Sequence, residues 1–235
     1  MSDDPHHQAM VGARPPGGGA DAGRFLRVRR RPSPVGLLRR RLSPALTPAG
    51  RIARLAGQLA IRTPAAIEDP FRTLAAVAVI LVPDPEAVLL IRRADREGDR
   101  WSGHMAFPGG RWSPGDSDLL ATARRETHEE VGVDLSEARL LGQFDDLAPR
   151  TPTLPPVIVR PFVLVLESRQ PLVPNGEVAG ARWTPLDELF EPGVYRPFEF
   201  ELGGTRMLLP GYHLDQGLVW GMTERILTPL LSLGS

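Results

Sequence analysis

Three glutamates lie close together on one predicted helix, where they could bind a divalent cation. The helix is expected over Leu119–Val131, and it carries Glu126, Glu129 and Glu130. At 100° per residue, Glu126 and Glu130 lie about 40° apart, and Glu129 lies about 60° to the other side. Like charges four residues apart destabilise a helix by about 0.2–0.5 kcal/mol per pair. A bound cation would remove this repulsion, and oxygen ligands without His or Cys favour Mg²⁺ or Mn²⁺ over zinc.

Glycines flank this helix on both sides. Phe107 and Pro108 lead into Gly109-Gly110, which we interpret as a turn whose bare backbone can approach a metal-bound phosphate closely. Gly132 follows the helix at the position of a C-cap. An isolated pair of glutamates is more often a solvated acidic face. The combination of loop, helix and cap favours a metal site instead.

The residues from Gly110 onward resemble the signature of the Nudix hydrolases, GX5EX7REUXEEXGU, in which U is a bulky aliphatic residue. The match from Arg125 onward is complete except for Thr127 in an aliphatic position. Asp116 stands where Glu is usual, and one extra residue separates it from Arg125. Two roles therefore stay open for Asp116: it could pair with Arg125, or it could serve as the N-cap of the helix.

The resemblance implies a Nudix-type α/β/α sandwich with a mixed sheet and a pyrophosphohydrolase activity that depends on Mg²⁺ or Mn²⁺. Arg125 would orient the carboxylates through an ion pair. The implied metal ligands are Glu126, Glu129, Glu130 and the carbonyl oxygen of Gly110. Glu129 is the first candidate for the general base that activates water, and Glu177 on a later loop is the second. His128 points away from the acidic face and is expected to be structural or exposed.

The segment upstream of the helix indicates a substrate. Residues 89–110 resemble the motif LLTXR(S/A)X3RX3GX3FPGG of coenzyme A pyrophosphatases. The Arg93-Ala94 pair and the spacing from Gly103 to the two glycines fit this motif. Ile91 replaces Thr, the middle arginine is displaced, and one residue is inserted. The resemblance implies hydrolysis of coenzyme A or its thioesters to 3′,5′-ADP and 4′-phosphopantetheine.

The same segment supplies the candidate substrate-binding residues. Arg93, Arg96 and Arg100 could bind the phosphates of a 3′-phosphoadenosine group, because guanidinium groups suit phosphate oxygens. Trp101 could stack on the base, and the backbone of Gly109 could approach the phosphates. The alternative is a surface loop in which these arginines are balanced by nearby acidic residues, namely Asp95, Glu97 and Asp99.

Two competing functions stay open. One is a Nudix hydrolase that acts on ADP-ribose, dinucleotides or oxidised nucleotides. The other is a catalytically silent Nudix-fold binding module with a basic N-terminus that could contact nucleic acid. The intact Arg125 and its three neighbouring glutamates argue against a silent module. We expect a small-molecule nucleotide as the partner and no nucleic acid, and the oligomeric state is open, with a homodimer among the options.

The other predicted elements alternate between strands and helices, which indicates an α/β fold. The strands are expected over residues 74–82, 88–91, 140–144, 157–166 and 178–183. A hairpin over 198–209 is expected to turn at Gly203-Gly204. A short helix is expected over Leu186–Leu189, and a C-terminal amphipathic helix over 217–231 with Val219, Met222, Ile226 and Leu230 on one side.

The N-terminal part differs in composition from the rest of the 235 residues. Residues 1–62 contain 12 arginines and three acidic residues, although the whole chain has a formal net charge of zero. Residues 1–23 are rich in Gly, Pro and Ala and are predicted to be a disordered tail. Residues 24–70 are expected to form an Arg-rich, partly helical extension, and 71–235 the Nudix hydrolase domain.

One helix is predicted within this extension, over residues 47–61. Thr47 would be its N-cap and Pro48 its first residue. Ile52, Leu55 and Leu59 form an apolar stripe, which favours a helix packed on the acidic domain over a free arm for an anionic partner or a membrane surface.

The location expected from the sequence is the cytoplasm. No apolar run approaches the ~18 residues of a membrane span, and arginines interrupt the one candidate for a signal sequence. An organelle transit peptide is the alternative for this Arg-rich start. The absence of cysteine excludes disulfides and cysteine-ligated zinc.

Overall fold

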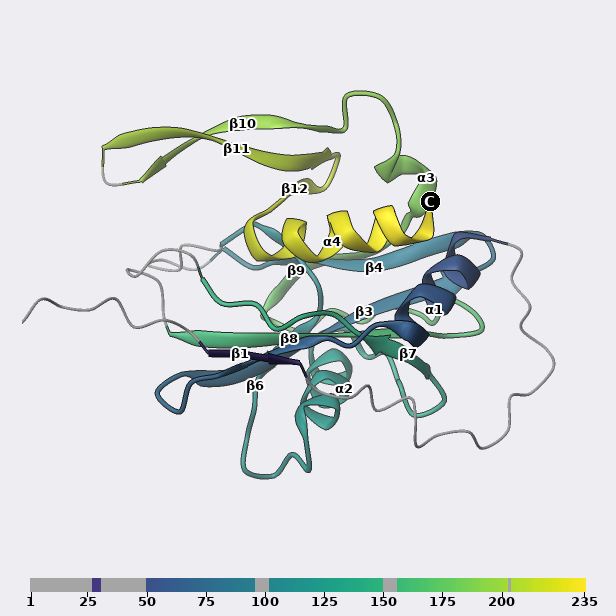
Figure 1. Ribbon diagram of the computed structural model, residues 1–235. Helices are drawn as coiled ribbons and strands as arrows, with labels where there is room; N and C mark the ends of the chain where they lie inside the picture. Colours follow the sequence, from purple (N-terminus) through teal and green to yellow (C-terminus); the bar gives the residue numbers. More distant parts are fainter. Residues whose placement is uncertain (1–26, 31–49, 96–101, 150–155, 203) are drawn as a thin grey trace, which may run out of the picture.

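The computed structural model describes residues 27–30, 50–95, 102–149, 156–202 and 204–235. A mixed seven-stranded sheet forms its centre, with helices on both faces (Figure 1). The strands of this sheet are β3 (Thr73–Pro83), β4 (Glu86–Arg93), β5 (Met105–Ala106), β6 (Gly109–Arg111), β7 (Arg139–Gln143), β8 (Val157–Val165) and β9 (Val178–Pro185). The predicted α/β fold with a mixed sheet is confirmed.

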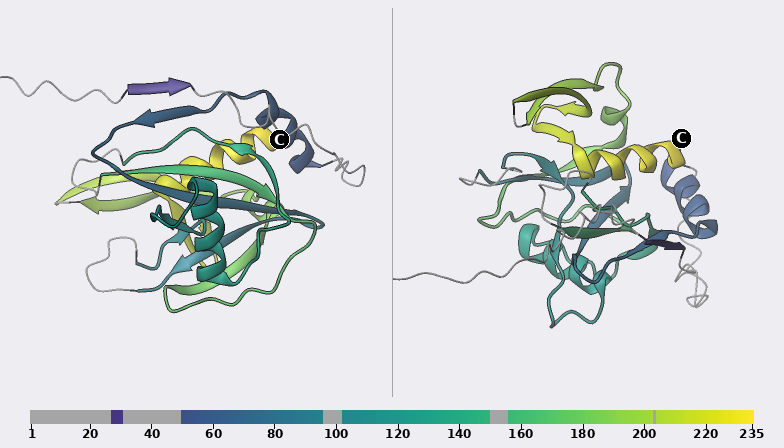
Figure 2. Two further views of the ribbon diagram at one scale, coloured as in Figure 1. Left: turned by 90° about the horizontal axis from the view of Figure 1, so that it is seen from below. Right: turned by 60° about the vertical axis from the view of Figure 1, so that its left-hand side comes forward.

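The strand order is β5-β4-β3-β8-β7, with β6 paired to β3 and β9 paired to β4. β3 runs parallel to β8 and antiparallel to β4, which makes the sheet mixed. The helices are α1 (Arg51–Ile61), α2 (Leu119–Val131), α3 (Leu186–Leu189) and α4 (Gly221–Gly234). α2 lies on one face of the sheet, and α1 and α4 lie on the other (Figures 1 and 2).

Alternation along β3 supplies two separate cores, because successive side chains of a strand point to opposite faces. Ala78 and Ile80 belong to the core under α2, together with Ala123 of that helix. Val79 and Leu81 belong to the core under α1 and α4. The continuous apolar run from 74 to 82 is thus explained by burial on both faces.

A second, smaller sheet projects beyond α4 (Figures 1 and 2). It contains β10 (Tyr195–Leu202), β11 (Thr205–Leu214) and β12 (Gly217–Trp220), all antiparallel. The hairpin predicted over 198–209 is the outer part of β10 and β11. The C-terminal helix was predicted to begin at residue 217, and this prediction is wrong: Val219 is fully buried in β12, and α4 begins only at Gly221.

Helix α1 packs on the domain, as its apolar stripe predicts. Ile52, Leu55 and Leu59 are buried in the core that they share with α4. The helix begins at Arg51 with Gly50 as its N-cap, so the predicted start at Pro48 is wrong. The reason lies far away in the chain, because the Glu86 side chain accepts a hydrogen bond of 3.0 Å from the backbone N–H of Ile52.

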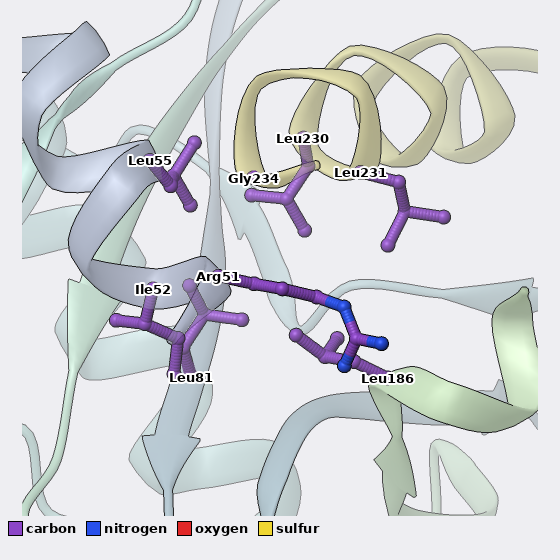
Figure 3. Close-up of a pocket in the computed structure, with 8 residues that line it drawn as sticks. All are labelled: Arg51, Ile52, Leu55, Leu81, Leu186, Leu230, Leu231 and Gly234. Carbon is purple, nitrogen blue, oxygen red and sulfur yellow. The ribbon is translucent and has the colours of Figure 1, made fainter. Parts of the chain in front are cut away.

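The small cavity between α1 and α4 is a packing gap (Figure 3). Its volume of about 10 Å³ leaves room for no more than one water molecule. Apolar side chains line it, with Arg51 at one side.

β1 (Arg27–Arg30) and β2 (Ala65–Glu68) form a separate antiparallel sheet of two strands. The predicted tail over residues 1–23 and the first residues of the predicted helix, 47–49, lie outside the described residues. Among the described helices, none is long and apolar enough to cross a membrane.

Candidate active site

The helix that carries the glutamates is fixed at both ends. Asp118 is its N-cap, and the Asp118 carboxylate accepts a hydrogen bond of 2.7 Å from the backbone N–H of Ala121. At the other end, Gly132 adopts a left-handed conformation with φ of 73°, and its N–H donates to the carbonyl of His128. Both ends of α2 coincide with the prediction, and the N-cap role left open for Asp116 belongs to Asp118.

The two glycines before the helix form strand β6, so the predicted Pro-Gly-Gly turn is wrong. Gly109 and Gly110 pair with Val77 and Ala76 of β3. A Cβ at Gly109 would lie 2.2 Å from the carbonyl oxygen of Ala76, and the φ of Gly109 is +149°. Glycine is therefore required here by the close approach of the two backbones.

Glu130 is the most deeply buried of the three glutamates, with 5% of its surface exposed. Its Oε2 accepts a hydrogen bond of 2.9 Å from the backbone N–H of Gly109. Burial disfavours the charged form and raises the pKa of Glu130 to about 7, although this hydrogen bond opposes the shift. A buried carboxylate of this kind is stabilised by any cation that reaches it.

Glu126 lies directly against the other glycine of β6. A Cβ at Gly110 would come within 2.3 Å of the Glu126 carboxyl carbon, so any side chain there would displace this carboxylate from its present position. Burial raises the pKa of Glu126, and its ion pair with Arg125 lowers it in part. Glu126 also raises the pKa of Glu130 through charge repulsion.

Arg125 holds three carboxylates at once. Its guanidinium forms ion pairs of 2.8 Å with Asp116, 3.0 Å with Glu126 and 2.9 Å with Glu129. The contact with Asp116 is bidentate, because Nε and Nη2 donate to its two oxygens. This contact lowers the pKa of Asp116 and raises that of Arg125.

Asp116 is itself held by the start of the helix. Its Oδ2 accepts hydrogen bonds from the buried Thr122 hydroxyl at 2.9 Å and from the Ser113 backbone at 3.0 Å. The structure therefore places Asp116 as the partner of Arg125. Thr122 did not follow from the signature, and its position six residues after Asp116 is the only sequence signal for it.

The third glutamate is turned outward. The Glu129 side chain is 53% exposed and points to Arg125, not to the backbone of β6. Within the described part of the chain, no three His, Cys, Asp or Glu side chains converge as a preformed metal site. The donor set nevertheless fits a hard cation, since the buried Glu130 and the half-buried Glu126, both with raised pKa, lie against the β6 backbone.

Two further predicted residues come close to this helix from the sheet. Arg93 ends β4, where it pairs with Val178 of β9, and Glu177 immediately precedes β9. The charge of Arg93 lowers the pKa of Glu130, and the charge of Glu177 raises it. Both residues therefore border the carboxylate site. The other predicted substrate contacts, Arg96, Arg100 and Trp101, lie outside the described residues.

The remaining side chains of α2 follow the predicted pattern. Ala123, Thr127 and Val131 are fully buried, and His128 is exposed. Thr127, which occupies an aliphatic position of the signature, donates its hydroxyl hydrogen to the carbonyl of Ala123 at 2.7 Å. Its polar group is thus satisfied within the helix.

Comparison with known proteins finds related sequences over the part of the chain that carries this site. The model of the NUDIX domain matches residues 72–202. An uncharacterized Nudix hydrolase, NudL, of Yersinia pestis is 33% identical over 159 residues, which cover 66% of this chain and 77% of that protein.

An uncharacterized protein of Schizosaccharomyces pombe is 42% identical over 110 residues, 45% of this chain. The match spans only 33% of the length of that protein. Among solved structures, a MutT/nudix family protein from Enterococcus faecalis is similar with a TM-score of 0.47 and 20% identity, covering 68% of this chain and 61% of that one.

Proposed function

The chain belongs to the Nudix hydrolase family, and from this premise we propose that it hydrolyses a diphosphate bond with the help of Mg²⁺ or Mn²⁺. The observation that carries the proposal is the packing of Glu126 and Glu130 against Gly110 and Gly109. This packing holds two carboxylates at a backbone stripped of side chains. A diphosphate and its cation can approach such a surface closely.

The proposed ligands of the cation are Glu126, Glu130, Glu129 and the carbonyl oxygen of Gly110. When bound, the cation neutralises the phosphoryl oxygens and makes the attacking water more acidic. Burial disfavours the charged forms of Glu126 and Glu130 in the protein alone. Their negative charge would be compensated by the bound cation.

Arg125 acts as a positioning residue in this proposal. It holds Glu126 and Glu129 at its outer side and is anchored by Asp116 at its inner side. Because the Asp116 carboxylate also accepts from Thr122, the guanidinium has little freedom to turn. Thr122 in the first turn of α2 therefore helps to hold the side chains of Glu126 and Glu129 in place, through Asp116 and Arg125.

The general base has two candidates. Glu129 is exposed and adjoins the buried glutamates, but its carboxylate is engaged by Arg125. Glu177 lies on the sheet side of the site, where its charge is felt by Glu130. The variants Glu129→Gln and Glu177→Gln distinguish the two, because only loss of the base removes the low-pH limb from the profile of kcat against pH.

The proposed substrate is coenzyme A or one of its thioesters, hydrolysed to 3′,5′-ADP and the corresponding 4′-phosphopantetheine. The upstream resemblance supports this substrate, as does the charge of Arg93, which lowers the pKa of Glu130. Roles for Arg96, Arg100 and Trp101 in holding the phosphoadenosine group are part of the same proposal, as are a role for Gly109 beside the phosphates and a cytoplasmic location.

One experiment tests both the reaction and the substrate. The protein is incubated with coenzyme A and Mg²⁺ in ¹⁸O-labelled water, and the products are identified by mass spectrometry. We expect 3′,5′-ADP and 4′-phosphopantetheine, one of which carries the label. Turnover of ADP-ribose with none of coenzyme A would leave the diphosphate hydrolysis standing and overturn the substrate, whereas no turnover of either would favour a silent binding module.

A further inference from the structure

The projecting sheet has two unlike faces. Successive side chains of its strands point to opposite faces. Tyr212 and Val219 point to the same face, where they are buried next to α4. Tyr212 is also bonded through its hydroxyl to Thr228 of α4 at 2.9 Å. Farther out, the same face carries Glu201 and Arg206, which form an ion pair.

The opposite face is largely apolar, with Arg196 at its inner end and Thr205 at its outer end, and we call it the aromatic face. Register places Phe198 opposite Leu209 and Phe200 opposite Met207, so that all four side chains point to the same side. Trp220 lies opposite Gly211 on the next strand. The face comprises Phe198, Phe200, Met207, Leu209, His213 and Trp220, which are half-buried or, for Met207, 36% exposed.

The rings of this face contact one another at steep angles. Phe200 lies 4.6 Å from Trp220 at 45°, and Phe198 lies 5.6 Å from Trp220 at 75°. Such tilted rings offer no parallel slot for a flat base. They form an uneven apolar strip instead, and its length from Trp220 to Met207 is about 13 Å, four residues of strand.

The aromatic face is continuous with the active site through two residues. The His104 ring packs against Trp220 at 5.0 Å, and the carbonyl of His104 accepts a hydrogen bond of 3.1 Å from the backbone of Arg93. Arg93 in turn pairs with Val178 of β9, and the loop before this strand reaches α2, where the backbone N–H of Asn175 donates to the carbonyl of Glu130 at 2.9 Å. A substrate whose diphosphate lies at the glutamates can therefore reach Trp220 along this side.

We propose that the aromatic face binds an apolar chain on the half of the substrate that does not carry the nucleoside. The strip is elongated, and its side chains from Phe198 to Met207 are uncharged, as a hydrocarbon chain requires. Its Trp220 end packs on His104, which is hydrogen-bonded to Arg93 of β4. One polar atom lies within the strip, since the buried Nε2 of His213 has no hydrogen-bond partner among the described residues.

This inference rests on the proposed function, because it assigns the apolar arm of the same diphosphate substrate. Burial of one methylene group is worth roughly a fourfold gain in binding. Six added methylene groups on a half-open strip should therefore raise kcat/KM by at least about tenfold. The enzyme would then prefer octanoyl-coenzyme A to acetyl-coenzyme A.

The test compares kcat/KM for free, acetyl- and octanoyl-coenzyme A. In the variants Phe200→Gln and Met207→Gln, we expect the value for octanoyl-coenzyme A to fall to that for acetyl-coenzyme A. The matched control is Leu208→Gln, which changes a 70% exposed leucine on the other face of the same strand. This control should keep the full preference for the octanoyl chain.

Equal values of kcat/KM for all three compounds in the unaltered protein would overturn the proposal that the aromatic face binds the chain, and would leave the proposed function intact. If no coenzyme A derivative is hydrolysed, the proposed substrate is wrong. Calorimetric titration of Glu130→Gln with octanoyl-coenzyme A and with free coenzyme A then tests separately whether the aromatic face binds the chain. Tighter octanoyl binding supports it, and equal or no binding overturns it. Conversion of a dimer into a monomer by Met207→Gln, without any change in chain preference, would assign the face to a second copy.

Discussion

The approach of Glu126 to Gly110 predicts the result of adding a single methyl group. In Gly110→Ala, the new Cβ would lie 2.3 Å from the Glu126 carboxyl carbon, whereas ordinary contact begins at 3.4 Å. The carboxylate must therefore retreat by about 1.1 Å. A misplacement of about 1 Å in a catalytic group can reduce the rate by about 10²-fold.

We expect kcat/KM of Gly110→Ala to fall by about 10²-fold and the Mg²⁺ concentration for half-maximal activity to rise. The melting temperature should change little, because the displaced atoms are the free end of a flexible side chain and the φ of Gly110 is outside the left-handed region. Steady-state kinetics over a Mg²⁺ series, together with differential scanning fluorimetry, measures both quantities.

Two other glycines provide controls for this variant. Gly115→Ala places its Cβ in open space five residues later and should leave kinetics and melting temperature unchanged. Gly109→Ala would press its Cβ against the backbone of Ala76 and should lower the melting temperature instead. Activity of Gly110→Ala within threefold of the unaltered protein would refute the claim that Glu126 works from its present position.

Three further predictions concern charge and packing. Glu130→Gln should lower kcat by at least about 10²-fold without lowering the melting temperature, because the amide oxygen can still accept from Gly109 and the desolvated charge is gone; a parallel loss of stability would contradict this. Asp116→Asn should lower both activity and stability near neutral pH. The pKa of Asp116 is lowered in the folded protein, so its ion pair with Arg125 stabilises the fold above the unfolded pKa of about 3.8 and loses this effect as the pH falls further. The stability difference between the two proteins should thus be constant above about pH 5 and should shrink as the pH falls below 3.8 toward the lower folded pKa. A difference that stays unchanged down to pH 3 would count against the ion pair. Leu59→Ala should cost about 2–5 kcal/mol in urea unfolding, since this side chain is 2% exposed in the core shared with α4, and a cost below about 1 kcal/mol would show that α1 is not part of the domain core.

Patterns within a single element were sufficient for much of the fold. The bounds of α2 follow from its 3.6-residue apolar period and from Gly132, and both signals are local. The same kind of signal failed at residues 217–220, where Val219 fits a helical stripe with Ile226 and Leu230. Pairing with β11 determines the outcome there, and the partner lies in another strand.

Long-range contacts explain the other errors. Gly109-Gly110 has the composition of a turn, but β3 supplies a partner strand that accepts only glycine at Gly109. The start of α1 is set by Glu86, some 34 residues away along the chain. Neither contact leaves a trace in the residues next to the element concerned.

The role of Asp116 could not be predicted from the sequence. An aspartate two residues before Asp118 can satisfy either the helix start or the arginine nine residues later, and both roles are chemically sound. The choice depends on which carboxylate lies next to the free N–H groups at the start of α2. That carboxylate is Asp118, which accepts from the backbone N–H of Ala121. Asp116 is then free to receive Thr122 and both donors of Arg125. The extra residue between Asp116 and Arg125 therefore leaves the ion pair intact, and the first turn of α2 positions the glutamates through it.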